Sequence, residues 1–324
     1  MYTRSEIIGW GHYLPKKIMT NNDLAQIVET SDEWISTRTG IKSRHIVEDE
    51  TTSDLIFNAA QMALSRAGIS AQELDLILVA SITPDNTTPS VAAKVSNRLG
   101  TVSGTICFDI SAACSGFVYG LTVADNMIRL GQIKTALVVG AESLSKIVDW
   151  TDRNTCVLFG DGAGAVVLRA SEGEGTNADH GILATKLFAD GSHYDSLKTT
   201  GGVSTTKNAG FLFMDGKEVF KFAVNSLSQA AEDVMNQCGV TSQDIDFLIP
   251  HQANIRIISN VGEKLGLPEE KVIVAVDHHG NTSAASIPLA LSENIESGRI
   301  KKGDLLVLTA MGAGFTWGGA LIRF

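Results

Sequence analysis

The chain has 324 residues, of which 44% are hydrophobic and 19% are charged, and its formal net charge is −10. This length is enough for a large buried core in one or two domains, and the acidic balance disfavours nucleic acid as a partner. The first residues lack an apolar signal core and no apolar run approaches the roughly 18 residues of a membrane span, so we expect a cytoplasmic protein outside the membrane.

Four cysteines are spread along the chain, and none of them forms a C-x-x-C pair. A disulfide framework is unusual at this length and cysteine density, and zinc sites usually show closer spacing. We therefore expect neither a metal site nor disulfides. Cys107, Cys156 and Cys238 lie in apolar or ordinary settings and are interpreted as structural residues.

Two segments share one pattern, residues 67–80 and residues 238–251. In each, a glycine ends a helix, Ser70 or Thr241 caps a short turn, and an apolar strand follows. Weaker matches continue downstream, between residues 131–134 and 298–301 and between residues 162–169 and 318–323. Ordered repeats of this kind predict a duplicated chain of mixed α/β layers, with halves at residues 1–172 and 173–324.

Cys114 lies among small residues, between a strand-like run at residues 105–110 and a long apolar run that predicts a buried helix. The positive end of a helix dipole and unpaired backbone N–H groups favour the thiolate form of a cysteine. Cys114 is therefore a candidate nucleophile. A small buried hydrophobe is the alternative interpretation of a free cysteine.

The region most typical of a loop is residues 171–210, which is rich in Gly, Ser, Thr, Asn and Asp. It is either a surface insertion or part of a substrate mouth. Further along, His251 follows a predicted buried strand, at the end where α/β proteins usually place their sites. His279 is the second choice for a functional histidine.

Asn281 precedes another predicted helix, and the downstream offset of 167 residues relates it to Cys114. The repeat therefore predicts a thiol and an amide at equivalent helix starts in the two halves. Residues 311–315 follow the last long strand and form either a tight turn or a backbone site for an oxyanion. A Cys/His/Asn set also occurs in papain-like proteases, but duplicated α/β halves do not fit that class.

Five motifs together resemble the β-ketoacyl-acyl-carrier-protein synthase III family, and the resemblance covers essentially the whole chain. The motifs are Thr30-Ser-Asp-Glu-Trp-Ile-Ser-Thr-Arg-Thr-Gly-Ile41, Ala112-Ala-Cys-Ser-Gly-Phe117, Phe159-Gly-Asp-Gly-Ala-Gly164, Pro250-His-Gln-Ala-Asn254 and Gly280-Asn-Thr-Ser-Ala-Ala-Ser286. The resemblance implies the thiolase fold, in which two βαβαβ-type halves form five αβαβα layers, usually in a homodimer.

The resemblance also implies an activity, the initiating condensation of fatty acid synthesis. Acetyl-CoA or another short acyl-CoA would acylate Cys114, and a decarboxylative Claisen condensation with malonyl-acyl-carrier-protein would follow. Such a reaction needs no metal or redox cofactor. Cys114 matches the nucleophile, His251 and Asn281 match the pair that supports decarboxylation, and the backbone amides of Cys114 and Ala313 match the oxyanion hole.

Contacts with coenzyme A are implied in the same way. Trp34 and Arg153 resemble the pair that sandwiches adenine, and Arg38 resembles a phosphate contact. Phe220 and Asn254 resemble the walls of the pantetheine tunnel.

Two positions depart from the family in the acyl pocket, namely Thr88, where bacterial members often have phenylalanine, and Met311, before the glycine-rich turn. The smaller Thr88 predicts a roomier or differently shaped primer pocket. Arg256, Lys221 and Lys264 fit a basic patch that would dock an acidic acyl carrier protein.

Other functions of the same fold remain alternatives. A thiolase uses a second cysteine near the C-terminus, whereas no cysteine follows Cys238. Chain-elongating condensing enzymes use two histidines with the cysteine, whereas this chain has Asn281. A hydroxymethylglutaryl-CoA synthase or a secondary-metabolite relative is the main enzymatic alternative. An inactive protein that binds acyl thioesters is the alternative from another functional class.

Overall fold

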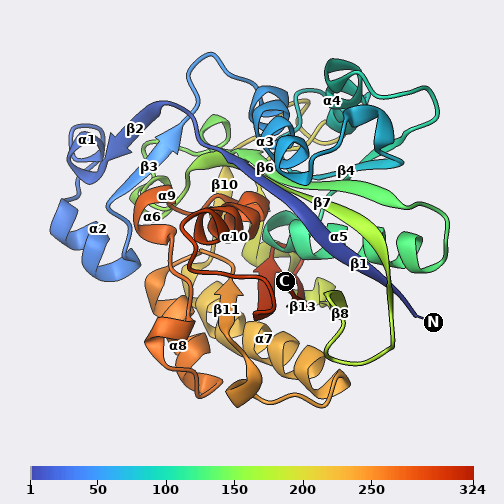
Figure 1. The fold of residues 1–324 in the computed structure, drawn as a ribbon. Coiled ribbons are helices and arrows are strands. Elements are labelled where there is room, and N and C mark those ends of the chain that lie inside the picture. The colour runs from blue at the N-terminus through green and yellow to red at the C-terminus, as the bar shows by residue number, and fades with distance from the viewer. Residues whose placement is uncertain (1) are drawn as a thin grey trace.

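The computed structural model describes residues 2–324, and most of its strands fall into two sheets (Figure 1). The first sheet has the order β1-β7-β6-β4-β5. Its strands are β1 (Tyr2–Tyr13), β7 (Asp161–Gly173), β6 (Thr135–Ser143), β4 (Leu76–Ala80) and β5 (Ile106–Ile110). β6, β4 and β5 run parallel, β7 is antiparallel to β6, and β1 is antiparallel to β7. β4 and β6 are buried throughout, which explains their unbroken apolar sequences.

The second sheet has the order β11-β12-β13-β8 and repeats the central pattern of the first. Its strands are β11 (Phe247–Pro250), β12 (Leu305–Gly312), β13 (Thr316–Arg323) and β8 (Gly181–Ala189). A parallel pair, β11 and β12, is continued by antiparallel β13, as β4 and β6 are continued by β7. Two short ribbons pair β2 (Lys17–Thr20) with β3 (Ser43–Ile46) and β9 (Leu197–Thr199) with β10 (Leu212–Met214).

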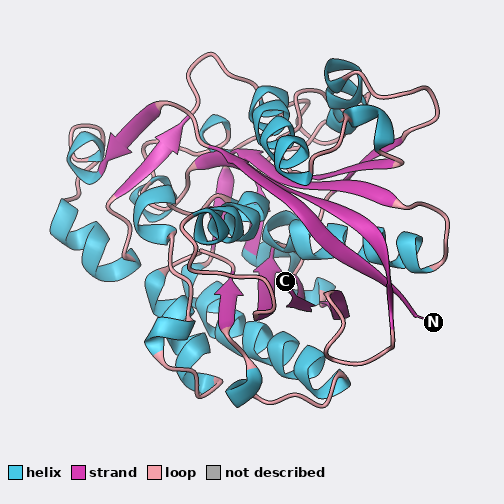
Figure 2. Ribbon diagram, viewed as in Figure 1, coloured by secondary structure: helices cyan, strands magenta, loops and turns pink. Residues whose placement is uncertain are grey.

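Helices form three layers that alternate with the sheets (Figures 1 and 2). The central layer lies between the sheets and consists of α5 (Gly116–Arg129) and α10 (Ser286–Glu296). The outer layers are α3 (Thr52–Ala67) with α4 (Val91–Leu99), and α7 (Gly216–Gln237) with α8 (Ile255–Lys264). The short helices are α1 (Asn21–Leu24), α2 (Asp32–Thr39), α6 (Arg153–Cys156) and α9 (Val276–His279). This is the five-layer architecture that the family resemblance implied.

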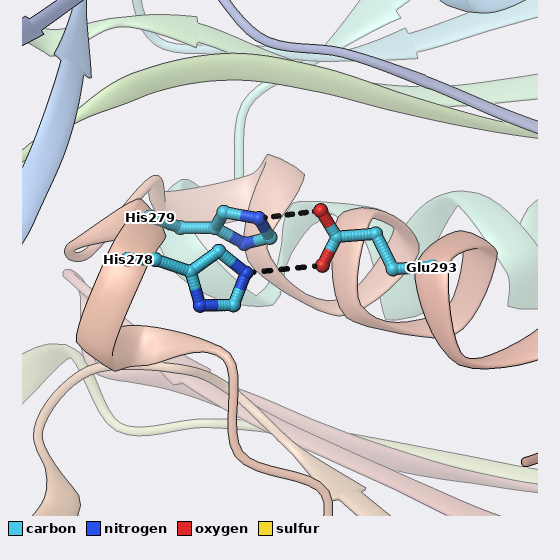
Figure 3. A group of neighbouring side chains, drawn as sticks. All are labelled: His278, His279 and Glu293. Carbon is cyan, nitrogen blue, oxygen red and sulfur yellow. Dashed lines mark hydrogen bonds and ion pairs between the residues drawn. The ribbon is translucent and has the colours of Figure 1, made fainter. Parts of the chain in front are cut away.

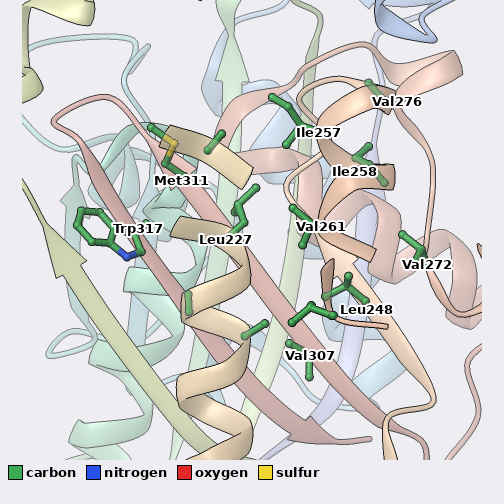
Figure 4. Close-up of a cluster of buried hydrophobic side chains, with 14 of the residues drawn as sticks. Leu227, Leu248, Ile257, Ile258, Val261, Val272, Val276, Val307, Met311 and Trp317 are labelled. Atoms are coloured by element: carbon green, nitrogen blue, oxygen red, sulfur yellow. The ribbon is translucent and has the colours of Figure 1, made fainter. Parts of the chain in front are cut away.

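Three apolar clusters hold the layers together. One lies beneath α3 and α4, one surrounds α5 and α10 between the sheets, and one lies beneath α7 and α8. Figure 4 shows part of the third cluster, in which Leu227 of α7 and Ile257 of α8 pack with Val307 and Met311 of β12. The cluster between the sheets draws residues from both halves of the chain, so the two halves share one core.

The repeated turns have the predicted capping. Gly68 and Gly239 adopt left-handed φ angles of 66° and 64° after α3 and α7. Ser70 and Thr241 then form capping boxes on matching 3₁₀ turns. These signals are local, which is why the sequence pattern located them.

The prediction of a loop over residues 171–210 is wrong in part. Residues 181–189 form β8, an edge strand of the second sheet, and five of its nine residues are only partly buried or exposed. The predicted domain boundary at residues 172 and 173 falls at the last residues of β7, before this strand begins. Part of the remaining segment, including Tyr194 and Leu197, reaches the wall of the central cavity.

The predicted counterpart of Cys114 is also wrong. Cys114 lies in a 3₁₀ turn, η2 (Ala113–Ser115), that leads into α5, and the matching turn η7 (Ser283–Ala285) leads into α10. Ala113 and Ser283 share left-handed φ angles of 46° and 50°. Cys114 therefore corresponds to Ala284, and Asn281 lies before the turn. The downstream offset of 167 misled the alignment because α10 has 11 residues where α5 has 14.

Each of these two turns packs on a strand of the other half. A Cβ atom on Gly312 of β12 would lie 2.5 Å from the Cys114 backbone nitrogen, and one on Gly140 of β6 would lie 2.1 Å from the Ala284 carbonyl oxygen. Both separations are far shorter than van der Waals contact, so only glycine permits this approach.

No helix among residues 2–324 combines the length and apolar composition needed to cross a bilayer.

Candidate active site

A cavity of about 760 Å³ opens where β5 and β11 end, and both halves of the chain contribute to its wall. Cys114, His251 and Asn281 all line it. The three residues lie 30 or more positions apart in sequence, and the fold brings them to one space. A cavity at the carboxyl ends of parallel strands is the usual place for a site in α/β proteins.

The Cys114 thiol is not predisposed to ionise in the free protein. Burial raises the pKa of this thiol to about 12, with a further rise from Glu142, while the Ser283 hydroxyl opposes the change. A helix dipole is worth up to ~2 kcal/mol, or roughly 1.5 pH units of pKa, so the amino terminus of α5 lowers the pKa less than burial raises it. The sequence predicted a thiolate favoured by the helix, and burial outweighs that effect.

His251 follows β11 and is held by a single hydroxyl. Its Nδ1 lies 2.7 Å from Ser286 Oγ, and the Gln252 backbone N–H donates to the same oxygen at 3.3 Å. Among residues 2–324 the Ser286 hydroxyl has no other acceptor, so its proton goes to Nδ1. Burial lowers the pKa of His251 to about 4, and the ring is neutral at pH 7. Its one proton is therefore on Nε2.

Asn281 is fixed by its own backbone and by the turn that follows. Its N–H donates to the Leu158 carbonyl at 2.8 Å, and its carbonyl accepts from the Gly160 N–H at 3.0 Å. The Ser283 N–H donates to Asn281 Oδ1 at 2.9 Å. With Oδ1 engaged, the Nδ2 amine is the group that Asn281 has to offer a ligand, and it is a hydrogen-bond donor.

The backbone amides assigned to an oxyanion lie on either side of the contact between the halves. Cys114 and Ala313 both line the cavity, and Gly312 approaches the Cys114 nitrogen closely. Within residues 2–324 the Ala313 N–H makes no hydrogen bond to a protein group. An unoccupied amide on a cavity wall is what a developing oxyanion requires.

Sequence reasoning missed two buried residues behind the site. Glu142, at the end of β6, accepts from the Thr83 hydroxyl at 2.6 Å and the Ser283 hydroxyl at 3.3 Å, and burial raises its pKa to about 7. A charged residue in an apolar strand was the available signal for Glu142. Ser286 had no such signal, because it belongs to a run of small residues that indicates only close packing.

The residues expected at the adenine end gather around one tryptophan. The guanidinium carbons of Arg38 and Arg153 lie 4.6 and 4.8 Å from the Trp34 ring centroid. Asn254 caps α8 and donates to the Arg38 carbonyl at 3.2 Å. Asn254 and Phe220 line the cavity, which connects this group to the interior.

Of the two residues predicted to line the acyl pocket, Met311 does so and Thr88 does not. Met311 lines the cavity, whereas the wall near residue 88 is made by Asn86 and Thr87 and not by Thr88. Thr88 therefore does not contact the cavity within this chain. Asn86 and Thr87 are polar, and neither carries the aromatic ring that bacterial members of the family often have at this position.

The expected basic patch is spread along two helices. Arg256, at the start of α8, lies over the ring of Phe220 at 5.4 Å, and Phe220 lines the cavity. Lys221 follows Phe220 on α7, and Lys264 is at the far end of α8, where it bonds Asn225 at 2.8 Å. Lys264 lies eight positions after Arg256, or about 12 Å along the helix.

Comparison with known proteins places this site in a family. Residues 108–191 match the family model for 3-oxoacyl-[acyl-carrier-protein] synthase III, and residues 235–324 match the model for its C-terminal part. A β-ketoacyl-[acyl-carrier-protein] synthase III of Rhodospirillum centenum is 58% identical over 100% of both chains, and one of Paramagnetospirillum magneticum is 57% identical over the same share.

Solved structures agree with the sequence comparison. The 3-oxoacyl-[acyl-carrier-protein] synthase III of Aquifex aeolicus superposes with a TM-score of 0.93 at 50% identity, over 99% of this chain and 100% of the other. The enzyme from Pseudomonas aeruginosa gives a TM-score of 0.93 at 42% identity, over 99% and 98%. The predicted thiolase-like fold is confirmed, and the chain belongs to the β-ketoacyl-[acyl-carrier-protein] synthase III family of condensing acyltransferases.

Proposed function

We propose that this enzyme carries out the initiating condensation of fatty acid synthesis, with Cys114 as the acyl acceptor and His251 with Asn281 as the decarboxylation pair. The observation that carries these roles is the shared cavity, which presents one thiol and two neutral hydrogen-bond donors. A protein with this set can hold an acyl group and stabilise an enolate without a resident metal or redox cofactor.

In the first half-reaction the sulfur of Cys114 attacks the carbonyl carbon of an acyl-CoA thioester. The tetrahedral oxyanion accepts hydrogen bonds from the backbone N–H groups of Cys114 and Ala313, and each such donor is worth roughly 3 kcal/mol in comparable sites. Collapse expels the CoA thiolate, which takes up the proton that the Cys114 thiol has lost. The products are acyl-Cys114 and CoA.

In the second half-reaction malonyl-acyl-carrier-protein loses carbon dioxide, and the electron pair of the broken bond moves to the thioester enolate. His251 Nε2–H and Asn281 Nδ2–H donate to the enolate oxygen. Because the imidazole is neutral, it stabilises the enolate by hydrogen bonding and does not protonate its carbon. The carbanion then attacks the carbonyl carbon of acyl-Cys114, and collapse of the tetrahedral intermediate releases β-ketoacyl-acyl-carrier-protein and the Cys114 thiolate. The thiolate takes one proton from solvent, which restores the free thiol.

The division of labour is tested by separating the two half-reactions. Mass spectrometry after mixing with acetyl-CoA reports the acyl adduct, and product formation with malonyl-acyl-carrier-protein reports condensation. We expect Cys114→Ala to form no adduct, and Asn281→Ala to keep acylation while condensation falls about 100-fold or more. Equal loss of both steps in Asn281→Ala would contradict the assignment, and CoA binding without an adduct on Cys114 would indicate a binding protein.

The choice of primer follows from the end of the cavity. Asn86 and Thr87 line the cavity near residue 88, and neither carries an aromatic ring. We infer that acyl groups longer than acetyl, or branched ones, fit this pocket. A competition among acyl-CoA primers in the condensation assay decides the point, and clear preference for acetyl-CoA over all longer primers would overturn it.

We also propose that an acidic carrier protein docks at the basic residues beside the cavity and that the enzyme works in the cytoplasm. Arg256 and Lys221 lie beside Phe220, which lines the cavity, and positive charge there would attract an acidic carrier protein. Added salt should therefore lower kcat/KM for the carrier more than for a neutral pantetheine substrate. All four cysteines are free, which suits a reducing cytoplasm.

A further inference from the structure

We propose that His278, His279 and Glu293 form a binding site for a divalent transition-metal ion of the zinc type, outside the catalytic cavity. Both imidazole rings direct Nε2 at the same carboxylate (Figure 3). The distances are 2.8 Å from His279 and 3.3 Å from His278 to the two oxygens of Glu293. The site goes beyond the proposed condensation, in which it takes no part.

The ligand set and spacing suit zinc. Two histidines and a glutamate with one open position are a known zinc set, with bonds near 2.0–2.2 Å. Tetrahedral ligand atoms at such bond lengths lie about 3.3 Å apart. Here the three candidate atoms lie within 4.8 Å of one another, so closure needs shifts of about 1 Å. His278 is half exposed and can make such a shift, and it leaves a path from solvent.

A supporting hydrogen bond is already in place. Asp277 Oδ1 lies 2.8 Å from His278 Nδ1, so the ring is oriented with Nε2 toward Glu293. A carboxylate on the far nitrogen of a histidine is the usual outer partner of a metal ligand. His279, in contrast, is fully buried, and its Nδ1 has no partner among residues 2–324. Its ring is therefore held by packing and by Glu293.

The site lies on the two helices that flank the segment with Asn281, so a bound ion would affect that segment. His278 and His279 end α9, Glu293 belongs to α10, the segment between the two helices carries Asn281, and Ser286 is the first residue of α10. A bound ion would tie the end of α9 to the second turn of α10, across this segment. It would therefore act on the geometry of the decarboxylation pair without touching a substrate.

The surrounding charges favour a cation only modestly. Glu296 and Asp277 add negative charge, whereas Arg66 bonds Glu296 at 2.8 Å and Lys42 lies near Asp277. The neighbouring histidines His12 and His45 are too far to be ligands. Affinity must therefore come from the three ligands themselves, and this makes the site testable by single substitutions.

The test uses the whole enzyme and Co²⁺ as a spectroscopic substitute for Zn²⁺. We expect one ion per chain, with visible absorption of a four-coordinate site and no thiolate charge-transfer band, because the ligands are nitrogen and oxygen. Glu293→Gln keeps a hydrogen-bonding side chain but loses the charge, and should abolish binding. Asp277→Asn, at the surface, should weaken binding about 10- to 100-fold.

Asp190→Asn is the matched control, because Asp190 lies 3.8 Å from His193 in another histidine–carboxylate pair outside the group. It should leave Co²⁺ binding unchanged. Zn²⁺ should also raise the Tm of the wild type and of Asp190→Asn but not of Glu293→Gln. Binding that is equal in all variants, or a thiolate band that disappears in Cys114→Ala, would overturn the proposal. The acylation assay on Cys114 is independent of either result.

Discussion

Burial leaves both reacting groups uncharged in the free enzyme. The pKa of Cys114 is raised to about 12 and that of His251 is lowered to about 4, so a thiol and a neutral imidazole are the resting forms across the physiological range. Neither group depends on a preformed ion pair, in contrast to cysteine enzymes in which an imidazolium lowers the thiol pKa.

The alkylation rate of Cys114 should therefore keep rising with pH. Only the thiolate reacts with iodoacetamide, and its fraction grows about tenfold per pH unit below the pKa. We expect a slope near one in the logarithm of the rate between pH 7 and pH 9, followed by mass spectrometry at Cys114. A plateau below pH 8 would show that α5 lowers the thiol pKa more than burial raises it.

Ser286 is a positioning residue, because it places the proton of His251 without touching a substrate. In Ser286→Ala the donor to Nδ1 is lost, and we expect the proton to distribute over both ring nitrogens. Condensation should fall by about tenfold or more while acylation of Cys114 is unchanged, and ¹⁵N NMR of His251 should show the change of tautomer. Ser286→Thr keeps the hydroxyl and should recover both signals.

Ser292→Ala provides the matched control on the same helix. Ser292 is as buried as Ser286, and its hydroxyl lies 2.8 Å from His12 Nδ1, outside the cavity. A fall in condensation of equal size in both variants would show that Ser286 acts only through the packing of α10.

At the level of elements, the turn that carries Cys114 depends on the strand beneath it. Gly312→Ala would bring a methyl group to 2.5 Å from the Cys114 nitrogen, where one oxyanion donor is located. We expect acylation to fall about 100-fold or more, measured as the rate of adduct formation from acetyl-CoA. Gly191→Ala, where no atom lies within 4 Å, should leave that rate unchanged.

Local signals in the sequence predicted most elements well. The apolar runs of β4 and β6 and the glycines after α3 and α7 determine structure over a few residues, so pattern was sufficient. The alignment of Cys114 with its counterpart in the second half depends on the length of α10. No local signal in the sequence defines that length. Ser286 and Glu142 act through partners 35 and 141 residues away, and only the folded chain brings those partners together.

On the scale of the whole molecule, β5 leaves one edge of the first sheet open. Ile106 is 40% exposed there, and Phe108 and Ile110 are only partly buried. An open edge with apolar side chains is a template for pairing with another strand. We propose that β5 of a second copy pairs with it to make a homodimer.

Light scattering should therefore give about twice the chain mass of 34.4 kDa. Ile106→Lys places a charge at the edge and should shift the protein toward the monomer. Leu130→Lys, at an apolar residue that is 74% exposed and lies outside the sheet edge, should leave the mass unchanged. A dimer in both variants would assign the interface to another surface.

Each of the two turns packs on a strand of the other half, and this contact also limits the evolution of the enzyme. Once each turn rested on a strand of the other copy, the duplicated segments were no longer free to diverge independently. A larger residue at Gly140 would displace the turn at Ala284, and a larger residue at Gly312 would displace the turn at Cys114. A substitution that compensates for such a change must therefore arise in the opposite half of the chain. The two turns therefore keep the same backbone conformation and differ in their side chains. Cys114 carries a thiol in the first turn, and Ala284 carries a methyl group in the second.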